Sequence, residues 1–341
     1  MNIKQIAKQA GVSVATVSRV LNHPENVAPG TREKIQKIID EAEYTPNWFA
    51  QGLNFNRTKT IGLVLPHNMI SAYMEVANGV EEVARQKDYI TFICNMDKNP
   101  SKEKEYIDQL ITRKVDGLIL LYSTLDEEYA RWIEEENVPT VFIGENKTRE
   151  NWSSVNVDNR GGAADMTAHL IECGHKRIAI LCGNDPEPES ESMLQGYKNV
   201  LKASGFLVDE KLILHVQNNI EGGYIGMKRL IGGMPKLPDA VFATSDEIAY
   251  GAMDAIKEAG LKIPDDIAIA GFGNDRMSSL MEPKLTTVEL PYRKMGIYGA
   301  RILFDLMSED RFEGNVSKIK LQTKMRVRKS CGHKGRIGEM F

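Results

Sequence analysis

From residue 60 onward, short apolar runs alternate with longer amphipathic stretches, and this alternation constrains the fold more than any other feature of the sequence. The apolar runs are TIGLVLP, YITFICN, DGLILLY, PTVFIG, RIAILCG, AVFATS and DIAIAGF. Strands that lack a polar–apolar alternation and are separated by helices are typical of parallel sheets covered on both faces. Because the runs form two groups, we predict two doubly wound α/β lobes.

The length and composition are those of a globular protein with more than one structural unit. A chain of 341 residues exceeds what one compact core usually holds, and a charged content of 26% is ordinary. No run reaches the roughly 18–20 apolar residues of a membrane helix, and no apolar segment follows a basic start as in a signal peptide. We therefore predict a cytoplasmic protein with no membrane partner.

The cysteines suggest neither a metal site nor disulfides. Four are spread along the chain without a Cys-x-x-Cys pair: Cys94, Cys173, Cys182 and Cys331. Their spacing predicts reduced thiols. His169, Cys173 and His175 are close in sequence, but ECGH is typical of a helix end, and no second ligand pair lies within the usual spacing. We predict no metal, no cofactor and, since no Gly-x-Ser-x-Gly elbow occurs, no catalytic site.

The first residues predict a helix-turn-helix. A helix over residues 3–10 has Asn2 as its cap and Gln5 in a capping-box position, and Gly11 allows a tight turn. Ser13 then caps a second helix, VATVSRVLN, and a third helix begins at Pro29. Two short helices joined by a turn of this length form a helix-turn-helix, and the third helix would close a small core.

The second of these helices has the pattern of a DNA-reading element. Its expected inward residues are Val14, Val17, Val20 and Leu21, and its expected outward residues are Ala15, Thr16, Ser18, Arg19 and Asn22. Small and hydroxyl side chains allow close approach to a major groove, where Arg19 can read a guanine. Residues 1–60 carry eight Lys or Arg and five Asp or Glu, whereas the whole chain has a net charge of −4. A basic head on an acidic body can approach phosphates with one end.

These residues closely resemble the LacI/GalR family of bacterial repressors. The resemblance begins with NIKQIAKQAGVSVATVSRVLN, TREKI and YTPNWFAQGL and extends through VDNRGG, SDEIAYGAM and PKLTTVELP over nearly the whole chain. It implies an all-α helix-turn-helix headpiece plus an α/β two-lobed, periplasmic-binding-protein-like core with parallel sheets. It also implies a homodimer that binds double-stranded, palindromic operator DNA as a transcription regulator, most often a repressor.

The resemblance places DNA contacts in the headpiece and in a hinge that follows it. We expect contacts from Ile3, Ser13, Val14, Ala15, Thr16, Ser18, Arg19, Asn22, Thr31, Asn47, Ala50, Gln51 and Leu53. Asn47 would cap a short hinge helix that is marginal unless DNA holds it. Leu53 matches the family leucine that wedges into a central base step, and Ala50 the small residue that permits close helix approach.

The domain boundaries follow from the same patterns. They are residues 1–45 for the headpiece, 46–59 for the hinge and linker, 60–330 for the core and 331–341 for a tail. Within the core, one lobe would comprise residues 60–158 and 289–320, and the other residues 159–288 and 321–330. The tail is basic and unpatterned, so we predict that it is disordered.

Three positions depart from the pattern of sugar-binding members. Met193 stands where an arginine is common, Gly273 where an aspartate is common, and Gly144 at a third, usually acidic position. Arginine and carboxylates are natural partners of sugar hydroxyls, so a sugar or sugar phosphate is only one candidate effector. The expected cleft residues are Tyr73, Glu145, Met193, Ser245 and Asp275. The acidic stretch DPEPESES is interpreted as a solvated surface loop.

Two alternatives to a small-molecule effector stay open. The absence of the arginine and acidic residues at these three positions resembles the catabolite control branch of the family. The co-effector of that branch is the serine-phosphorylated carrier protein HPr. Arg301 matches a basic residue that this branch uses for its partner. Just before Met295, however, Arg293 and Lys294 replace the tyrosine and the acidic residue that the branch has at these two positions. The other alternative is a sugar-binding module that retains a vestigial DNA-binding head.

Overall fold

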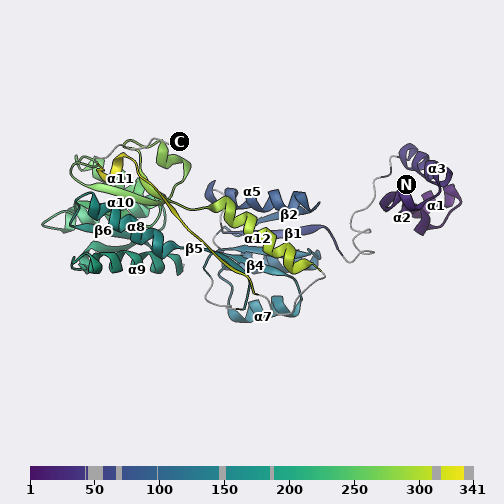
Figure 1. The fold of residues 1–341 in the computed structure, drawn as a ribbon, viewed down its shortest axis with the longest axis horizontal. Coiled ribbons are helices and arrows are strands. Elements are labelled where there is room, and N and C mark those ends of the chain that lie inside the picture. The colour runs from purple at the N-terminus through teal and green to yellow at the C-terminus, as the bar shows by residue number, and fades with distance from the viewer. Residues whose placement is uncertain are drawn as a thin grey trace. The chain divides into compact units, whose positions relative to one another are not determined.

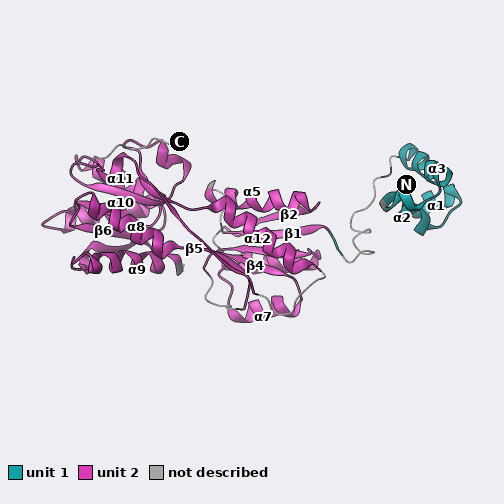
Figure 2. Ribbon diagram, viewed as in Figure 1, with its two compact units in different colours: residues 1–58 teal, residues 59–341 magenta. Residues whose placement is uncertain are grey.

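The computed structural model describes residues 1–42, 44, 57–66, 71–97, 99–145, 151–184, 188–308 and 316–333. Residues 1–58 and 59–341 form two compact units (Figure 2). The predicted hinge residues Asn47, Ala50, Gln51 and Leu53 lie outside the described residues, so their predicted DNA contacts remain predictions.

The first unit is a three-helix headpiece (Figure 1). Its elements are α1 (Ile3–Ala10), α2 (Val14–Asn22), the 3₁₀ turn η1 (Pro24–Asn26) and α3 (Pro29–Glu41). The capping box of Asn2 and Gln5, the left-handed Gly11 and the Ser13 cap are all present. The local hydrogen-bonding groups thus define the helix ends as the sequence predicts.

The headpiece core lies where the three helices meet. It consists of Ile6, Ala7, Ala10, Val17, Val20, Ile35, Ile38 and Ile39, with Ile3 and Leu21 packed against it. The prediction that Val14 faces inward is wrong, because this side chain is 40% exposed. Val14 is the first residue of α2 and directly follows the Ser13 cap.

The second unit contains two six-stranded sheets. The first sheet has the order β11-β5-β4-β3-β1-β2 and is entirely parallel. Its strands are β1 (Thr60–Leu65), β2 (Ile90–Asn95), β3 (Gly117–Leu121), β4 (Thr140–Ile143), β5 (Ser154–Val157) and β11 (Lys318–Leu321). Its inner strands are continuous apolar runs because helices cover both faces.

The second sheet has the order β12-β10-β9-β8-β6-β7. Its strands are β6 (Ile178–Gly183), β7 (Ile213–Val216), β8 (Ala240–Ala243), β9 (Ala268–Gly273), β10 (Thr286–Glu289) and β12 (Lys324–Arg326). Only the β10–β12 pair is antiparallel among the described strand pairs of this sheet. The two predicted doubly wound lobes are therefore confirmed.

Helices cover both faces of each sheet. The first lobe has α5 (Ser71–Gln86) and α12 (Tyr292–Met307) on one face and α6 (Pro100–Thr112) and α7 (Glu127–Glu135) on the other. The second lobe has α10 (Ile220–Gly233) and α11 (Asp246–Glu258) on one face and α8 (Asn159–Glu172) and α9 (Pro188–Ala203) on the other. Short 3₁₀ turns η2 (Glu210–Leu212), η3 (Arg276–Ser279) and η4 (Lys329–Cys331) complete the second lobe. No described helix is long and apolar enough to span a bilayer.

The chain crosses between the lobes three times. The crossings join β5 to α8, β10 to α12 and β11 to β12 (Figure 1). After the third crossing, η4 packs on the second lobe and Cys331 is completely buried. The prediction of a disordered tail from residue 331 is therefore wrong for Cys331. Its side chain packs with the core residues of α8 and α9, which the sequence pattern of a basic terminus does not indicate.

Candidate DNA-contacting surface and effector cavity

Helix α2 presents a polar face on a buried base. Val17 and Val20 are buried beneath it, while Ala15 and Arg19 are exposed and Thr16 and Ser18 are half-buried. The side chain of Asn22 lies outside the described part of the chain. Such a face can enter a major groove because Arg19 is the one long side chain among its described residues and its neighbours are small.

Ser13 caps the start of α2. The Ser13 hydroxyl accepts a hydrogen bond from the backbone N–H of Thr16 at 3.1 Å, and the two hydroxyl oxygens are 2.9 Å apart. One hydroxyl proton lies between these two oxygens, which leaves the other hydroxyl proton and the first N–H groups of α2 to donate to a phosphate oxygen. Ile3 packs partly into the headpiece core, and Thr31 is half-buried in the first turn of α3.

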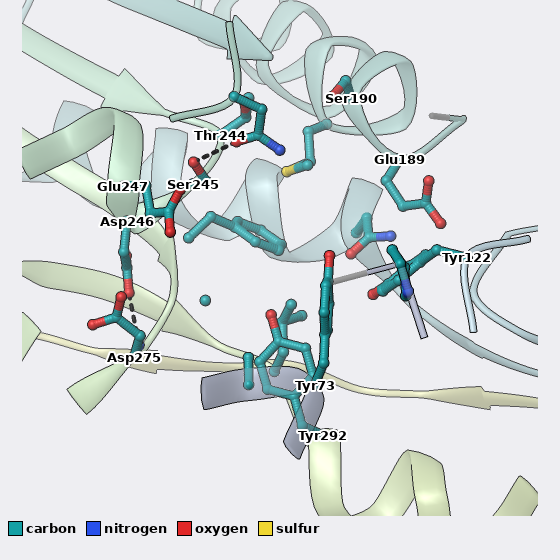
Figure 3. Close-up of a pocket in the computed structure, with 18 of the residues that line it drawn as sticks. Tyr73, Tyr122, Glu189, Ser190, Thr244, Ser245, Asp246, Glu247, Asp275 and Tyr292 are labelled. Atoms are coloured by element: carbon teal, nitrogen blue, oxygen red, sulfur yellow. Dashed lines mark hydrogen bonds between the residues drawn. The ribbon is translucent and has the colours of Figure 1, made fainter. Parts of the chain in front are cut away.

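The second candidate site is a cavity of about 270 Å³ between the lobes, at the carboxyl ends of both sheets (Figure 3). Four of the five predicted cleft residues line it: Tyr73, Met193, Ser245 and Asp275. Tyr73, Tyr122 and Tyr292 lie at one side of it and Ser245 and Glu247 at another (Figure 3). A ligand held there would contact both lobes, as expected for this topology.

Asp246 is a buried carboxyl group that lines the cavity. It begins α11 directly after β8 and is 3% exposed. Its carboxyl oxygens accept hydrogen bonds from the Thr287 hydroxyl at 2.5 Å and from the Asp275 N–H at 2.8 Å. Burial raises the pKa of Asp246 to about 7, although these two hydrogen bonds oppose the rise. Near neutral pH the group can therefore either donate to or accept from a ligand.

Glu189 is a cavity residue that the sequence analysis missed. It lies in the first turn of α9 and is 6% exposed, so the reading of DPEPESES as a solvated loop is wrong for this residue. Glu189 Oε1 accepts a hydrogen bond from the backbone N–H of Glu145 at 2.9 Å. The Ser192 hydroxyl donates to the Glu145 carboxylate at 3.0 Å. These contacts join the end of β4 in one lobe to α9 in the other.

Glu145 is therefore not among the described residues that line the cavity, and the prediction that it lines the cleft is corrected. Its side chain turns to Ser192 and its backbone positions Glu189, whose carboxyl group reaches the cavity instead. Asp275 does line the cavity, but Oδ1 accepts from the Tyr250 hydroxyl at 2.5 Å and from the N–H of Met277 at 2.7 Å. That oxygen caps η3, which leaves Asp275 less capacity for a ligand.

The three departures from the sugar-binding pattern have visible structural consequences. Met193 is buried and gives the cavity an apolar patch. Gly144 has a φ of +105°, and a Cβ atom there would lie 2.4 Å from the ring of Tyr122. Tyr122 thus occupies the space that an acidic side chain would need. Gly273 lines the cavity, and its φ of +136° is a backbone conformation that residues other than glycine rarely adopt.

The sequence analysis also missed the cavity residues Asp246, Tyr122 and Tyr292. Asp246 and Tyr122 each follow the carboxyl end of a buried strand, where ligands of parallel sheets bind, so their positions could have been predicted. Tyr292 begins α12 just after a crossing between the lobes, which only the topology shows.

Arg301 is exposed on α12, with its guanidinium 5.9 Å from the centre of the Tyr298 ring. Arg293 on the same helix pairs with Glu82 at 2.9 Å and Glu75 at 3.8 Å, both on α5. The cation that replaces the expected tyrosine is therefore engaged within the lobe.

Comparison with known proteins agrees with a helical headpiece followed by a two-lobed core. Residues 2–47 match the family model of bacterial regulatory proteins, lacI family, and residues 167–331 match that of the periplasmic binding protein-like domain. Catabolite control protein A of Staphylococcus xylosus is 37% identical over 310 residues, which cover 91% of this chain and 93% of that protein.

Two solved structures extend the likeness to the three-dimensional fold. A complex of the transcriptional regulator CelR with cellobiose has a TM-score of 0.74 and 30% identity. The Lac repressor dimer bound to operator and the anti-inducer ONPF has a TM-score of 0.85 and 26% identity. Each match covers 97% of this chain and 99% of the other.

Proposed function

Because the chain belongs to the LacI family of bacterial regulatory proteins and is a DNA-binding transcriptional regulator, we propose that it represses genes of carbon metabolism from a palindromic operator, as a homodimer. The observation that carries this proposal is the exposed polar face of α2 with Arg19 extending from it. One such helix from each protomer would occupy successive major grooves. The site of action would be the bacterial chromosome in the cytoplasm.

The operator is identified by selecting bound sequences from random DNA with the full chain. We expect a consensus with two-fold symmetry, because a symmetric dimer reads two inverted half-sites. A consensus without symmetry would contradict the dimeric mode of binding, and enrichment of no sequence would contradict the proposal as a whole.

Arg19→Ala is expected to weaken binding to the selected operator by about 10–100-fold, which corresponds to roughly 1–3 kcal/mol, and to relax the preference at one base pair. Fluorescence anisotropy with operator and with random DNA measures both affinities. The control is Lys37→Ala, which removes an exposed cation from α3 that pairs with Glu41. An equal loss of affinity for operator and random DNA in Arg19→Ala would assign Arg19 to a phosphate.

The effector we propose is a neutral sugar held in the cavity between the lobes. The described lining residues include the carboxyl groups of Glu189, Asp246, Glu247 and Asp275 and the rings of Tyr73, Tyr122 and Tyr292, but no lysine or arginine. Carboxyl groups accept hydrogen bonds from sugar hydroxyls and repel phosphate. Aromatic rings can pack against the apolar face of a sugar ring.

A thermal-shift panel of neutral mono- and disaccharides and sugar phosphates tests this choice. A neutral sugar at a hundred times its Kd should stabilise the core by about 2.7 kcal/mol and raise its Tm, whereas sugar phosphates should not. Tyr73→Ala should abolish the shift, and Tyr106→Ala, a half-buried tyrosine on α6 away from the cavity, should retain it. A shift with sugar phosphates alone would overturn the proposal.

A second candidate co-effector is serine-phosphorylated HPr, which the likeness to catabolite control protein A and the exposed Arg301 favour. An arginine can bind a phosphoserine through paired hydrogen bonds. In the same panel, this carrier should shift the wild type but not Arg301→Ala if it docks on α12. A shift from phosphorylated HPr with none from any sugar would make this candidate the better one.

A further inference from the structure

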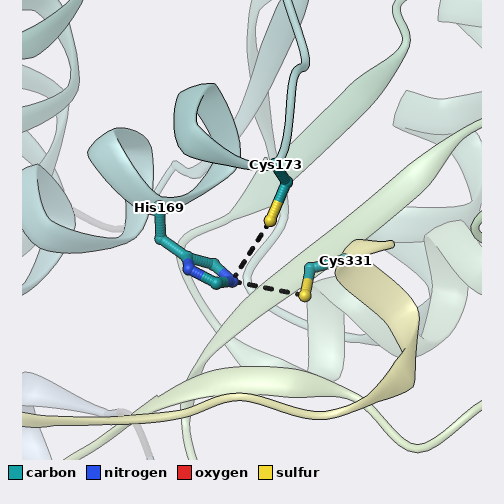
Figure 4. A group of neighbouring side chains, drawn as sticks. All are labelled: His169, Cys173 and Cys331. Atoms are coloured by element: carbon teal, nitrogen blue, oxygen red, sulfur yellow. Dashed lines mark hydrogen bonds between the residues drawn. The ribbon is translucent and has the colours of Figure 1, made fainter. Parts of the chain in front are cut away.

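Four metal-ligating side chains meet on the second lobe, outside both sites described above. His169 lies in the last turn of α8 and Cys173 follows as its C-cap, while Cys331 and His333 come from the end of the chain. The imidazole nitrogen Nε2 of His169 lies 3.3 Å from Cys331 Sγ and 3.6 Å from Cys173 Sγ (Figure 4). His333 Nδ1 lies 3.9 Å from Cys173 Sγ.

The sulfur–nitrogen separations among His169, Cys173 and Cys331 are close to those around a tetrahedral zinc ion, and His333 contacts this group through Cys173. With Zn–S bonds of about 2.3 Å and Zn–N bonds of about 2.0–2.1 Å, tetrahedral angles place sulfur and nitrogen ligands about 3.6 Å apart. The three sulfur–nitrogen distances are 3.3, 3.6 and 3.9 Å, which bracket this value. The ligand atoms of His169, Cys173 and Cys331 all lie within 4.8 Å of one another.

The backbone around the cluster holds its C-terminal half in place. The Ser330 hydroxyl donates to the Ile269 carbonyl at 2.6 Å and accepts the N–H of Thr286 at 2.8 Å. The His175 imidazole contacts the Cys331 carbonyl oxygen at 2.9 Å. Gly332 adopts a φ of +74°, which turns the chain so that His333 returns to Cys173. The ligands are thus positioned by contacts that no metal is needed to form.

We propose that His169, Cys173, Cys331 and His333 bind one structural Zn²⁺. Two thiolates and two imidazoles are a donor set typical of structural zinc. Binding replaces the two thiol protons, which pass to solvent, and leaves no position open for a substrate. Cys331 and His169 are buried, while His333 is exposed, so the ion enters from the His333 side.

This site would fasten the end of the chain to α8. The fastened segment follows β12, the strand that completes the third crossing between the lobes. The other end of α8 begins with Asn159, which lines the cavity. The spacing of ligands along the sequence predicts no zinc site because Cys331, the partner of Cys173 in space, is remote from it in the sequence.

The first test is the zinc content of the untagged full-length protein, purified without air and measured by mass spectrometry. We expect about one zinc ion per chain. His333→Asn, which changes an exposed residue, should lower zinc affinity at least about tenfold without unfolding the protein. His215→Asn, an exposed histidine on β7, and Cys94→Ser are the matched controls and should retain the metal.

Cobalt provides a second readout that does not depend on activity. Bound Co²⁺ should show the intense visible bands of a tetrahedral site and a thiolate charge-transfer band, which should weaken in Cys173→Ser. A strong zinc chelator should lower the Tm of the wild type by more than that of His333→Asn, because the variant binds the ion more weakly. Wild-type protein that binds zinc no more tightly than His333→Asn would overturn the proposal. So would a Cys173–Cys331 disulfide in protein kept from air.

Discussion

Ile35→Ala is expected to abolish operator binding while leaving the core intact. Ile35 is fully buried on α3, at the junction with α1 and α2. Removing three carbons from such a position costs about 2–5 kcal/mol. A unit of residues 1–58 has a small core, so its free energy of unfolding is at the low end for domains. The substitution therefore removes most of the free energy of unfolding of the headpiece.

Operator anisotropy and thermal unfolding of the core measure the two halves of this prediction. Operator affinity should fall to that of random DNA, while the Tm of the core and its response to ligands stay unchanged. Ile225→Ala is the matched control because it makes the same deletion on α10, where Ile225 is 43% exposed. Operator binding by Ile35→Ala within twofold of wild type would mean that DNA contacts alone can fold the headpiece.

Gly251→Ala is expected to destabilise the second lobe by about 3 kcal/mol. Gly251 lies on α11 where it crosses α10, and a Cβ atom there would approach the Ile220 carbonyl oxygen to 1.8 Å. Gly223 makes the reciprocal approach from α10, with its Cβ position 2.0 Å from the Ile248 carbonyl oxygen. Backbone meets backbone here, so the helices must separate to accept a methyl group. Because α11 begins with Asp246, separation also disturbs the cavity.

Urea unfolding and ligand-induced thermal shifts measure this effect. Gly232→Ala is the control, since nothing lies within 4 Å of a Cβ atom at this exposed position of α10. It should raise the free energy of unfolding by about 0.4–1 kcal/mol, because alanine has fewer unfolded conformations than glycine. Equal stability of the Gly251 and Gly232 variants would refute the role of close helix packing.

Features governed by near neighbours were predictable. The Asn2–Gln5 capping box, the Ser13 cap and the left-handed Gly11 depend on groups within three residues of each other, and all formed as predicted. The buried parallel strands also followed from their composition, because a strand covered on both faces must be apolar throughout. Val14 was wrongly predicted to face the core, because the spacing of apolar residues does not show which end of a helix the other helices leave exposed.

The sequence by itself therefore determined the helix ends, the strand cores and the two-lobed class, since these depend on local sterics and hydrogen bonding. Only the tertiary structure decided that Glu189 reaches the cavity, that Gly144 makes room for Tyr122 and that Cys331 lies beside Cys173. Those contacts join residues from different elements, and packing of whole helices and sheets sets their distances. A local sequence pattern cannot predict the distance between two such residues, because that distance depends on how the elements pack in the tertiary structure.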